Sequence, residues 1–170
     1  MTIGTYFAEG RKRQGYSQQR LSDEVAYARE TISKYENGER AIPKEAYAPL
    51  VKTIDDPELY FHVWSEKSDF VSIPYFDGDY INHQSLNIVH LVKKETEEAF
   101  DHLKHISWEK PAEVLSDYER EEAKQAMIEI LDAAASMVNL VAALCREYKF
   151  SMKDVFRAWH VSLKSRRYKK

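Results

Sequence analysis

The first 64 residues carry apolar side chains at the spacing of short amphipathic helices. Leu21 and Val25 lie four positions apart, and Ile32 and Tyr35 lie three apart, so each pair marks one side of a helix. This pattern predicts five short helices around a common apolar core. Their expected positions are about 3–14, 17–25, 28–36, 48–54 and 56–64.

Two prolines decide where the last two of these helices begin. Because proline is excluded from the interior of a helix, Pro49 predicts an irregular turn at 44–47 before a helix at 48–54. Asp56 followed by Pro57 predicts an N-cap and a first helical residue. The buried residues expected in that last helix are Leu59, Tyr60, Val63 and Trp64.

The predicted helix at 28–36 has a polar side opposite Ile32 and Tyr35. Asn37 and Gly38 follow it, and these are the residue types that adopt the left-handed conformation ending a helix with least strain. The polar side chains are of the kind that read base edges in DNA, but the same pattern also fits a solvated helix face. They are Arg29, Glu30, Ser33 and Lys34.

The pattern changes at residues 65–84, which contain Pro74, Asp77–Gly78 and scattered aromatic residues and are predicted to connect two domains. Ser85 then begins a predicted helix of about 20 residues. Ser116 and Glu119 form a capping box that opens the longest helix, which is expected to run to about residue 148. A final helix follows. The predicted domains are therefore 1–64 and 85–170.

The long helix repeats its apolar residues at alternating spacings of four and three, which is a heptad pattern. Its apolar face is larger than two neighbouring helices of about 20 residues would cover. A self-contained three-helix core and a homodimer are both compatible with this face, and we predict a homodimer. The residues predicted to form the dimer contact are Met127, Ile130, Ala134, Met137, Val141 and Leu144.

Composition supports an all-α protein, since only five glycines and five prolines interrupt 170 residues. The net charge of −3 is distributed unevenly. Residues 1–64 hold 9 basic and 10 acidic side chains, residues 65–150 hold 9 and 17, and residues 151–170 hold 7 and 1. The acidic middle would be repelled by phosphate, so a surface that faces nucleic acid should lie elsewhere. The basic end is either such a surface or a solvated helix end.

Residues 3–64 resemble the Cro and phage-repressor helix-turn-helix family, also called the XRE family. The resemblance implies an all-α, five-helix DNA-binding domain and a transcriptional regulator, most often a repressor from a phage, prophage or other bacterial element. Such a regulator binds double-stranded DNA, and as a homodimer it would recognise a palindromic operator. The residues that carry the resemblance are Arg11, Ser17–Gln18, Leu21, Thr31–Ile32–Ser33 and Glu36–Asn37–Gly38.

The resemblance also implies roles for individual residues. Gln18 should contact a phosphate and support the predicted helix at 28–36. Arg11 and Glu36 match a structural ion pair of the family. Three departures stand out: Ala26 replaces a turn glycine, Gly10 replaces an apolar core residue that Phe7 or Tyr16 would have to compensate, and Ala28 replaces a capping Ser or Thr. The positions implied to face bases are Arg29, Glu30, Ser33 and Lys34, and those implied to face phosphates are Thr31, Asn37 and Arg40.

Two alternatives remain open. The C-terminal half would bind a toxin if the chain were an antitoxin, and His102 with His105 and Glu98 would bind a metal if it were a metal sensor. No catalytic constellation or cofactor motif is present, so no enzyme, metal site or cofactor is expected. The apolar stretch at 133–145 is too short to span a bilayer. We therefore expect a soluble, cytoplasmic protein with no membrane contact.

Overall fold

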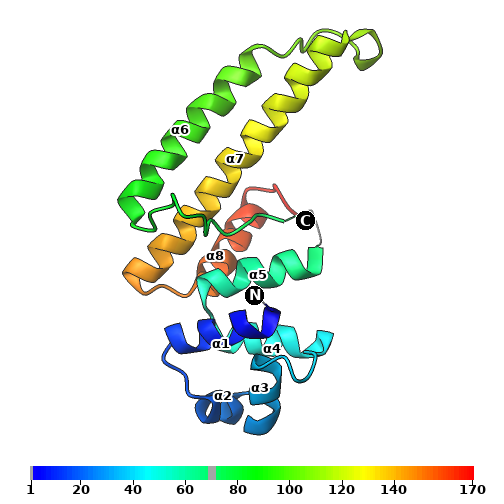
Figure 1. The fold of residues 1–170 in the computed structure, drawn as a ribbon. Helices are drawn as coiled ribbons and strands as arrows, with labels where there is room; N and C mark the ends of the chain where they lie inside the picture. The colour runs from blue at the N-terminus through cyan, green and yellow to red at the C-terminus, as the bar shows by residue number, and fades with distance from the viewer. Residues whose placement is uncertain (1, 69–71) are drawn as a thin grey trace. The chain divides into compact units, whose positions relative to one another are not determined.

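The computed structural model describes residues 2–68 and 72–170, and the described residues form helices joined by loops and turns (Figure 1). This confirms the predicted all-α class. The elements are α1 (Ile3–Arg13), α2 (Gln18–Glu24), α3 (Arg29–Glu36), α4 (Lys44–Ile54), α5 (Pro57–Ser68), α6 (Ser85–Lys104), a short 3-10 helix (Ala112–Val114), α7 (Asp117–Tyr148) and α8 (Met152–Ser165).

The chain divides into two compact units. The first unit contains residues 1–75 and 145–170, and the second contains residues 76–144. The sequence placed 145–170 in a C-terminal domain with the long helix. In the structure this stretch groups with the first unit, where the backbone N–H of Lys153 donates to the Asp55 carboxylate over 3.3 Å and its Nζ donates to the Lys52 carbonyl over 3.1 Å.

The core of the first unit is formed by apolar residues from α1 to α5. Phe7, Leu21, Ile32 and Leu59 are almost fully buried in it. α1 ends at Arg13 with Gln14 as its C-cap, and the following Gly15 has a φ of +70° that suits glycine. Asp56 caps α5 as predicted, because its Oδ1 accepts from the Leu59 N–H over 2.9 Å.

Two predictions about α4 and α5 were wrong. α4 begins at Lys44 and includes Pro49. The bond that this proline removes would have reached the carbonyl of Glu45, an exposed residue in the first turn. In α5, Phe61 is buried at 3% exposure, whereas Trp64 is 42% exposed. In α4, the burial of the apolar residues outweighs the helix-breaking tendency of Pro49. The buried residues of α4 are Ala46, Tyr47, Leu50, Val51 and Ile54.

In the second unit, α6 and the first part of α7 form a hairpin (Figure 1). The predicted capping box is present: the Ser116 N–H donates to Glu119 Oε2 over 2.9 Å, and the Glu119 N–H donates to Ser116 Oγ over 3.3 Å. Hydrogen bonds from Lys110 and from Ser116 lower the pKa of Glu119 to about 2. α7 therefore begins at the predicted place.

The burial of α7 is the reverse of what size would suggest. Its buried residues include Ala126 and Ser136, both at 0% exposure, and Asn139 at 2%. Ser136 Oγ donates to the Ala133 carbonyl, Asn139 Nδ2 donates to the Ala135 carbonyl, and Asn139 Oδ1 accepts from the Phe76 N–H over 3.0 Å, so these polar groups have partners. Large apolar residues of the same helix are exposed. α7 thus buries mainly small side chains and leaves several large ones exposed.

Candidate nucleic-acid interface

α2 and α3 form a helix-turn-helix in the first unit (Figure 1). Ser17 caps α2, because its hydroxyl accepts from the Arg20 N–H over 3.0 Å. The turn contains Ala26, which has no positive φ, so the alanine in place of a glycine is not strained. Ala28 starts α3 in extended conformation and provides no side-chain cap. The departure at Ala26 is thereby accommodated, whereas Ala28 leaves the start of α3 without a side-chain cap.

A buried ion pair fixes the end of α3 against α1. Arg11 Nε lies 2.6 Å from Glu36 Oε1, and Arg11 Nη2 lies 2.8 Å from Glu36 Oε2. Gln18 Nε2 donates to the same Oε2 over 2.9 Å, and Arg11 Nη1 donates to the Tyr16 carbonyl. The hydrogen bond to Glu36 raises the pKa of Arg11 despite burial. The ion pair implied by the family resemblance is therefore confirmed, and Gln18 does support α3.

The side of α3 that faces away from the core is exposed to solvent. Ile32 and Tyr35 are buried at 2% and 4% exposure, whereas Arg29, Glu30 and Lys34 are exposed. This arrangement holds three charged side chains on a helix whose inner side is fixed by packing. The exposed charged side chains therefore extend from a helix whose opposite side is packed in the core.

The other residues predicted to bind DNA lie on α2, on α3 and in the segment that follows α3. Asn37 ends α3, and Gly38 follows with a φ of +74°, as the sequence predicted. The Arg40 guanidinium lies 5.9 Å from the centre of the Tyr35 ring. Asn37 and Arg40 are exposed, while Gln18, Thr31 and Ser33 are half-buried. The eight predicted DNA-binding residues therefore come from α2, α3 and the segment after α3.

The sequence did not reveal two close contacts that position α1. A Cβ on Gly4 would lie 2.1 Å from the Tyr35 carbonyl oxygen, and a Cβ on Gly10 would lie 3.2 Å from Asp56 Oδ1. Asp56 also accepts two hydrogen bonds from Arg13, at 3.0 and 2.7 Å. Gly10 therefore makes room for the Asp56 side chain, while Phe7 is buried in the core and Tyr16 packs against it. The only local sign was a glycine at an apolar position.

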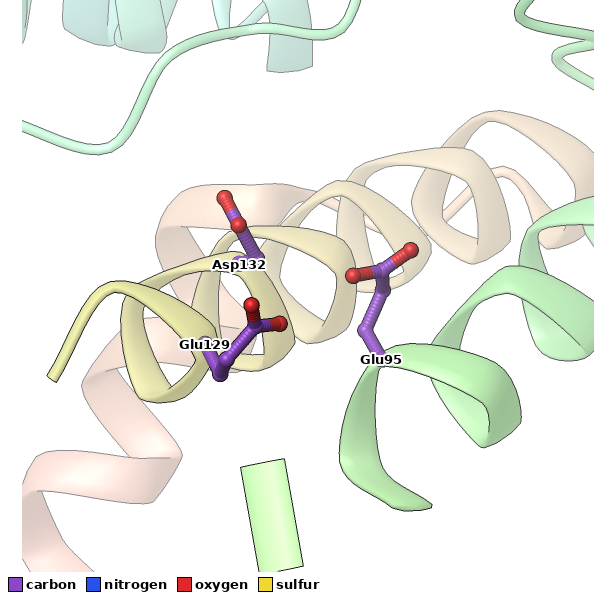
Figure 2. A group of neighbouring side chains, drawn as sticks. All are labelled: Glu95, Glu129 and Asp132. Atoms are coloured by element: carbon purple, nitrogen blue, oxygen red, sulfur yellow. The ribbon is translucent and has the colours of Figure 1, made fainter. Parts of the chain in front are cut away.

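The second unit contains a group of carboxylates that the sequence did not predict. Among the described residues, one oxygen each from Glu95, Glu129 and Asp132 lie within 4.8 Å of one another. Figure 2 shows Glu95 extending from α6 toward the two α7 side chains. Burial and the neighbouring Glu95 and Glu129 charges raise the pKa of Asp132. His102 Nε2 lies 3.9 Å from Glu129 Oε1, so one residue of the histidine pair considered as a metal site adjoins this group instead.

The predicted dimer residues are only partly covered within the chain. Met127, Ile130 and Met137 are 62%, 41% and 43% exposed, and Ala134, Val141 and Leu144 are half-buried. By length and composition alone, α7 is also long and apolar enough to cross a membrane, and 39% of its most apolar window is buried. α7 therefore has an apolar side that the rest of the chain leaves partly exposed.

Residues 7–53 match the family described as Helix-turn-helix. This segment is a helix-turn-helix of the Cro and phage-repressor type, as the sequence predicted. No curated protein and no solved structure matches the chain. The family match supports a regulator of transcription that binds DNA.

Proposed function

We propose that this protein is a phage- or prophage-type repressor that binds a near-palindromic operator as a homodimer. The observation that carries the proposal is the exposed polar side of α3, held in place by the buried Arg11–Glu36 pair. Two copies related by two-fold symmetry would present two α3 helices to successive major grooves. We propose that residues 1–64 bind DNA and that the long helix within 85–170 mediates dimerisation, with 65–84 joining the two regions, while residues 145–170 group with the first unit.

On α3, we assign base contacts to the exposed charged side chains. Arg29 can donate two hydrogen bonds to O6 and N7 of guanine, and Glu30 can accept from N4 of cytosine. Ser33 and Lys34 lie on the groove-facing side of the same helix. Gln18, Thr31, Asn37 and Arg40 would contact phosphates, which fixes the register without reading sequence. Gln18 retains an amide N–H for this role, since one already binds Glu36.

Dimerisation is part of the proposal because the helix-turn-helix region itself lacks excess positive charge. Residues 1–64 hold 9 basic and 10 acidic side chains, and the excess of basic residues in the first unit lies in 145–170. The surface formed by α2 and α3 therefore attracts phosphate only weakly, and sequence-specific affinity would come from placed contacts and from two copies bound at once. The proposed dimer contact is the apolar row on α7, consisting of Met127, Ile130, Ala134, Met137, Val141 and Leu144.

A second candidate is an antitoxin, in which the apolar side of α7 would bind a toxin protein. The exposure of Met127 and Met137 fits this candidate as well. The two differ in what covers α7 in the purified protein. A dimer that buries these residues favours the repressor, and a chain that remains uncovered until a second protein is added favours the antitoxin.

The proposal is tested by selecting bound sequences from a random DNA pool with the purified full-length protein. We expect two inverted half-sites at a fixed separation. A single half-site would contradict the dimeric operator, and enrichment of no sequence would contradict specific recognition. The same measurement with Arg29→Ala shows which base pair this residue reads.

A further inference from the structure

Large apolar side chains stand exposed along one side of α7. Met127 and Leu131 are 62% and 59% exposed, and Met137 is 43% exposed, while Ala126 and Ser136 of the same helix are fully buried. Exposure of these side chains to water is unfavourable, because burial of a Met or Leu side chain stabilises a protein by about 1.5–3 kcal/mol. Large apolar side chains that gather on one exposed side of a helix are a feature of surfaces that contact another molecule. The helix therefore has a second apolar surface in addition to the one used by its own chain.

The order of residues on this surface fits a second copy of the same helix running in the opposite direction. In an antiparallel pair of helices each a position of the heptad faces a d position of the partner. If Ala134 faces Met137 of a second copy, Ile130 faces Val141 and Met127 faces Leu144. Every pair then occurs twice, once on each side of a two-fold axis that passes between residues 135 and 136, as an isologous contact requires.

Side-chain size favours this direction over the parallel one. The antiparallel arrangement places the small Ala134 opposite the large Met137, and Ala123 opposite Tyr148. A parallel arrangement would place Ala134 opposite Ala134 and Met137 opposite Met137, so that narrow and wide layers alternate. Pairing large with small residues fills the space between helices more evenly.

Charge favours the same direction. Residues 117–132 of α7 hold six acidic and two basic side chains, whereas residues 133–148 hold one of each. Parallel helices would bring the two acidic halves together, and antiparallel helices keep them apart. The two carboxylates nearest the axis, Glu129 and Asp132, lie with Glu95 of α6 (Figure 2). The heptad also places them away from the a and d positions, so this contact buries no charge.

We infer that α7 pairs with α7 of a second copy as an antiparallel, two-fold contact in which Ala134 faces Met137. The inference rests on the homodimer of the proposed function and adds its direction and register. At a rise of about 1.5 Å per residue, the two Tyr148 ends would lie about 38 Å apart along the axis.

Disulfide formation between engineered cysteines tests the direction. The background is Cys145→Ser, because Cys145 is the single cysteine of the chain. Ile130→Cys and Val141→Cys are made separately, with different affinity tags, and are oxidised alone and after co-expression. We expect a cross-linked dimer from the co-expressed pair and little from either variant alone, because residue 130 of each copy lies about 16 Å from residue 130 of the other along the axis.

A second pair, Met127→Cys with Leu144→Cys, repeats the test with other residues in case one variant folds poorly. Glu97→Cys, an exposed position on α6, controls for random collision. Self-linking of Ile130→Cys would overturn the antiparallel direction while leaving the homodimer in place. A monomeric mass by light scattering at micromolar concentration would overturn both, as would a monomer that co-sediments with phosphatidylcholine vesicles. DNA selection remains a separate test of the operator.

Discussion

Gly4 in α1 lies directly against the backbone of Tyr35 in α3. A Cβ at position 4 would be 2.1 Å from the Tyr35 carbonyl oxygen and 3.2 Å from the Glu36 carbonyl oxygen. Both neighbours are backbone atoms near the end of α3, so neither can move without displacing that helix. This contact sets how closely α1 approaches the helix that carries the proposed base contacts.

Replacing Gly4 by alanine should destabilise the first unit. The added methyl group would force α1 away from α3, and overpacking of this kind typically costs about 1–3 kcal/mol. Urea unfolding followed by circular dichroism measures the change. Gly78→Ala is the matched control, because the nearest atom to its Cβ would be 4.0 Å away in the Ile81 side chain. Equal stability of the two variants would show that α3 tolerates the displacement.

Removing Glu36 should be more costly than removing an exposed carboxylate. Glu36→Ala leaves the guanidinium of Arg11, which is 7% exposed, without its partner. Breaking a buried pair typically costs about 3–5 kcal/mol. Glu39→Ala, at an exposed position three residues later, should change stability by less than about 0.5 kcal/mol. Thermal unfolding of both variants gives the comparison, and similar midpoints would exclude a stabilising role for the pair.

Arg29→Ala should weaken DNA binding and relax the preference at one base pair. Loss of a bidentate contact to guanine corresponds to about 1–3 kcal/mol of discrimination. Fluorescence anisotropy on the selected operator, on operators altered at each position and on random DNA measures it. Glu39→Ala serves as the control outside the proposed contact set. An equal loss on specific and random DNA would assign Arg29 to phosphate instead of a base.

Asp132→Asn should stabilise the second unit at neutral pH. The pKa of Asp132 is raised by burial and by Glu95 and Glu129, so the folded chain binds this proton more tightly than the unfolded chain. The resulting penalty is absent below the ordinary pKa of about 3.8 and is fully present above the raised pKa. The variant should therefore gain stability at pH 7 and lose that advantage near pH 3.

Asp101→Asn on α6 is the control for that experiment. Its hydrogen bond with Lys104 lowers the pKa of Asp101, so removal of this charge should give no stabilisation at pH 7. Urea unfolding at both pH values distinguishes the two variants. A stabilisation of Asp132→Asn that persists unchanged at pH 3 would have a cause other than charge.

Local signals in the sequence predicted the parts of the fold that depend on neighbouring residues. Ser116 and Glu119 marked the beginning of α7, and Gly38 marked the end of α3, because a cap or a positive φ needs only adjacent residues. The Arg11–Glu36 pair, 25 positions apart, was reached through the family resemblance instead. α2 and α3 were predicted both from local signals and from the family resemblance.

Features that depend on distant packing were missed. Pro49 was assigned to the beginning of a helix, but buried neighbours such as Tyr47 and Leu50 keep it inside α4. In α5 the apolar spacing did not distinguish Phe61 from Trp64, since both fit a helical stripe and only the neighbouring helices decide which is covered. The same limit applies to the carboxylate group, which joins Glu95 to residues more than 30 positions away.

The contact between Gly10 and Asp56 links two positions that lie far apart in the chain. A Cβ at position 10 would meet the Asp56 side chain at 3.2 to 3.4 Å, and that side chain in turn binds Arg13 and caps α5. A residue much larger than alanine at position 10 would therefore displace the Asp56 side chain unless position 56 became smaller. Among related sequences these two positions should covary, so that an apolar residue at 10 is accompanied by a shorter cap such as serine at 56.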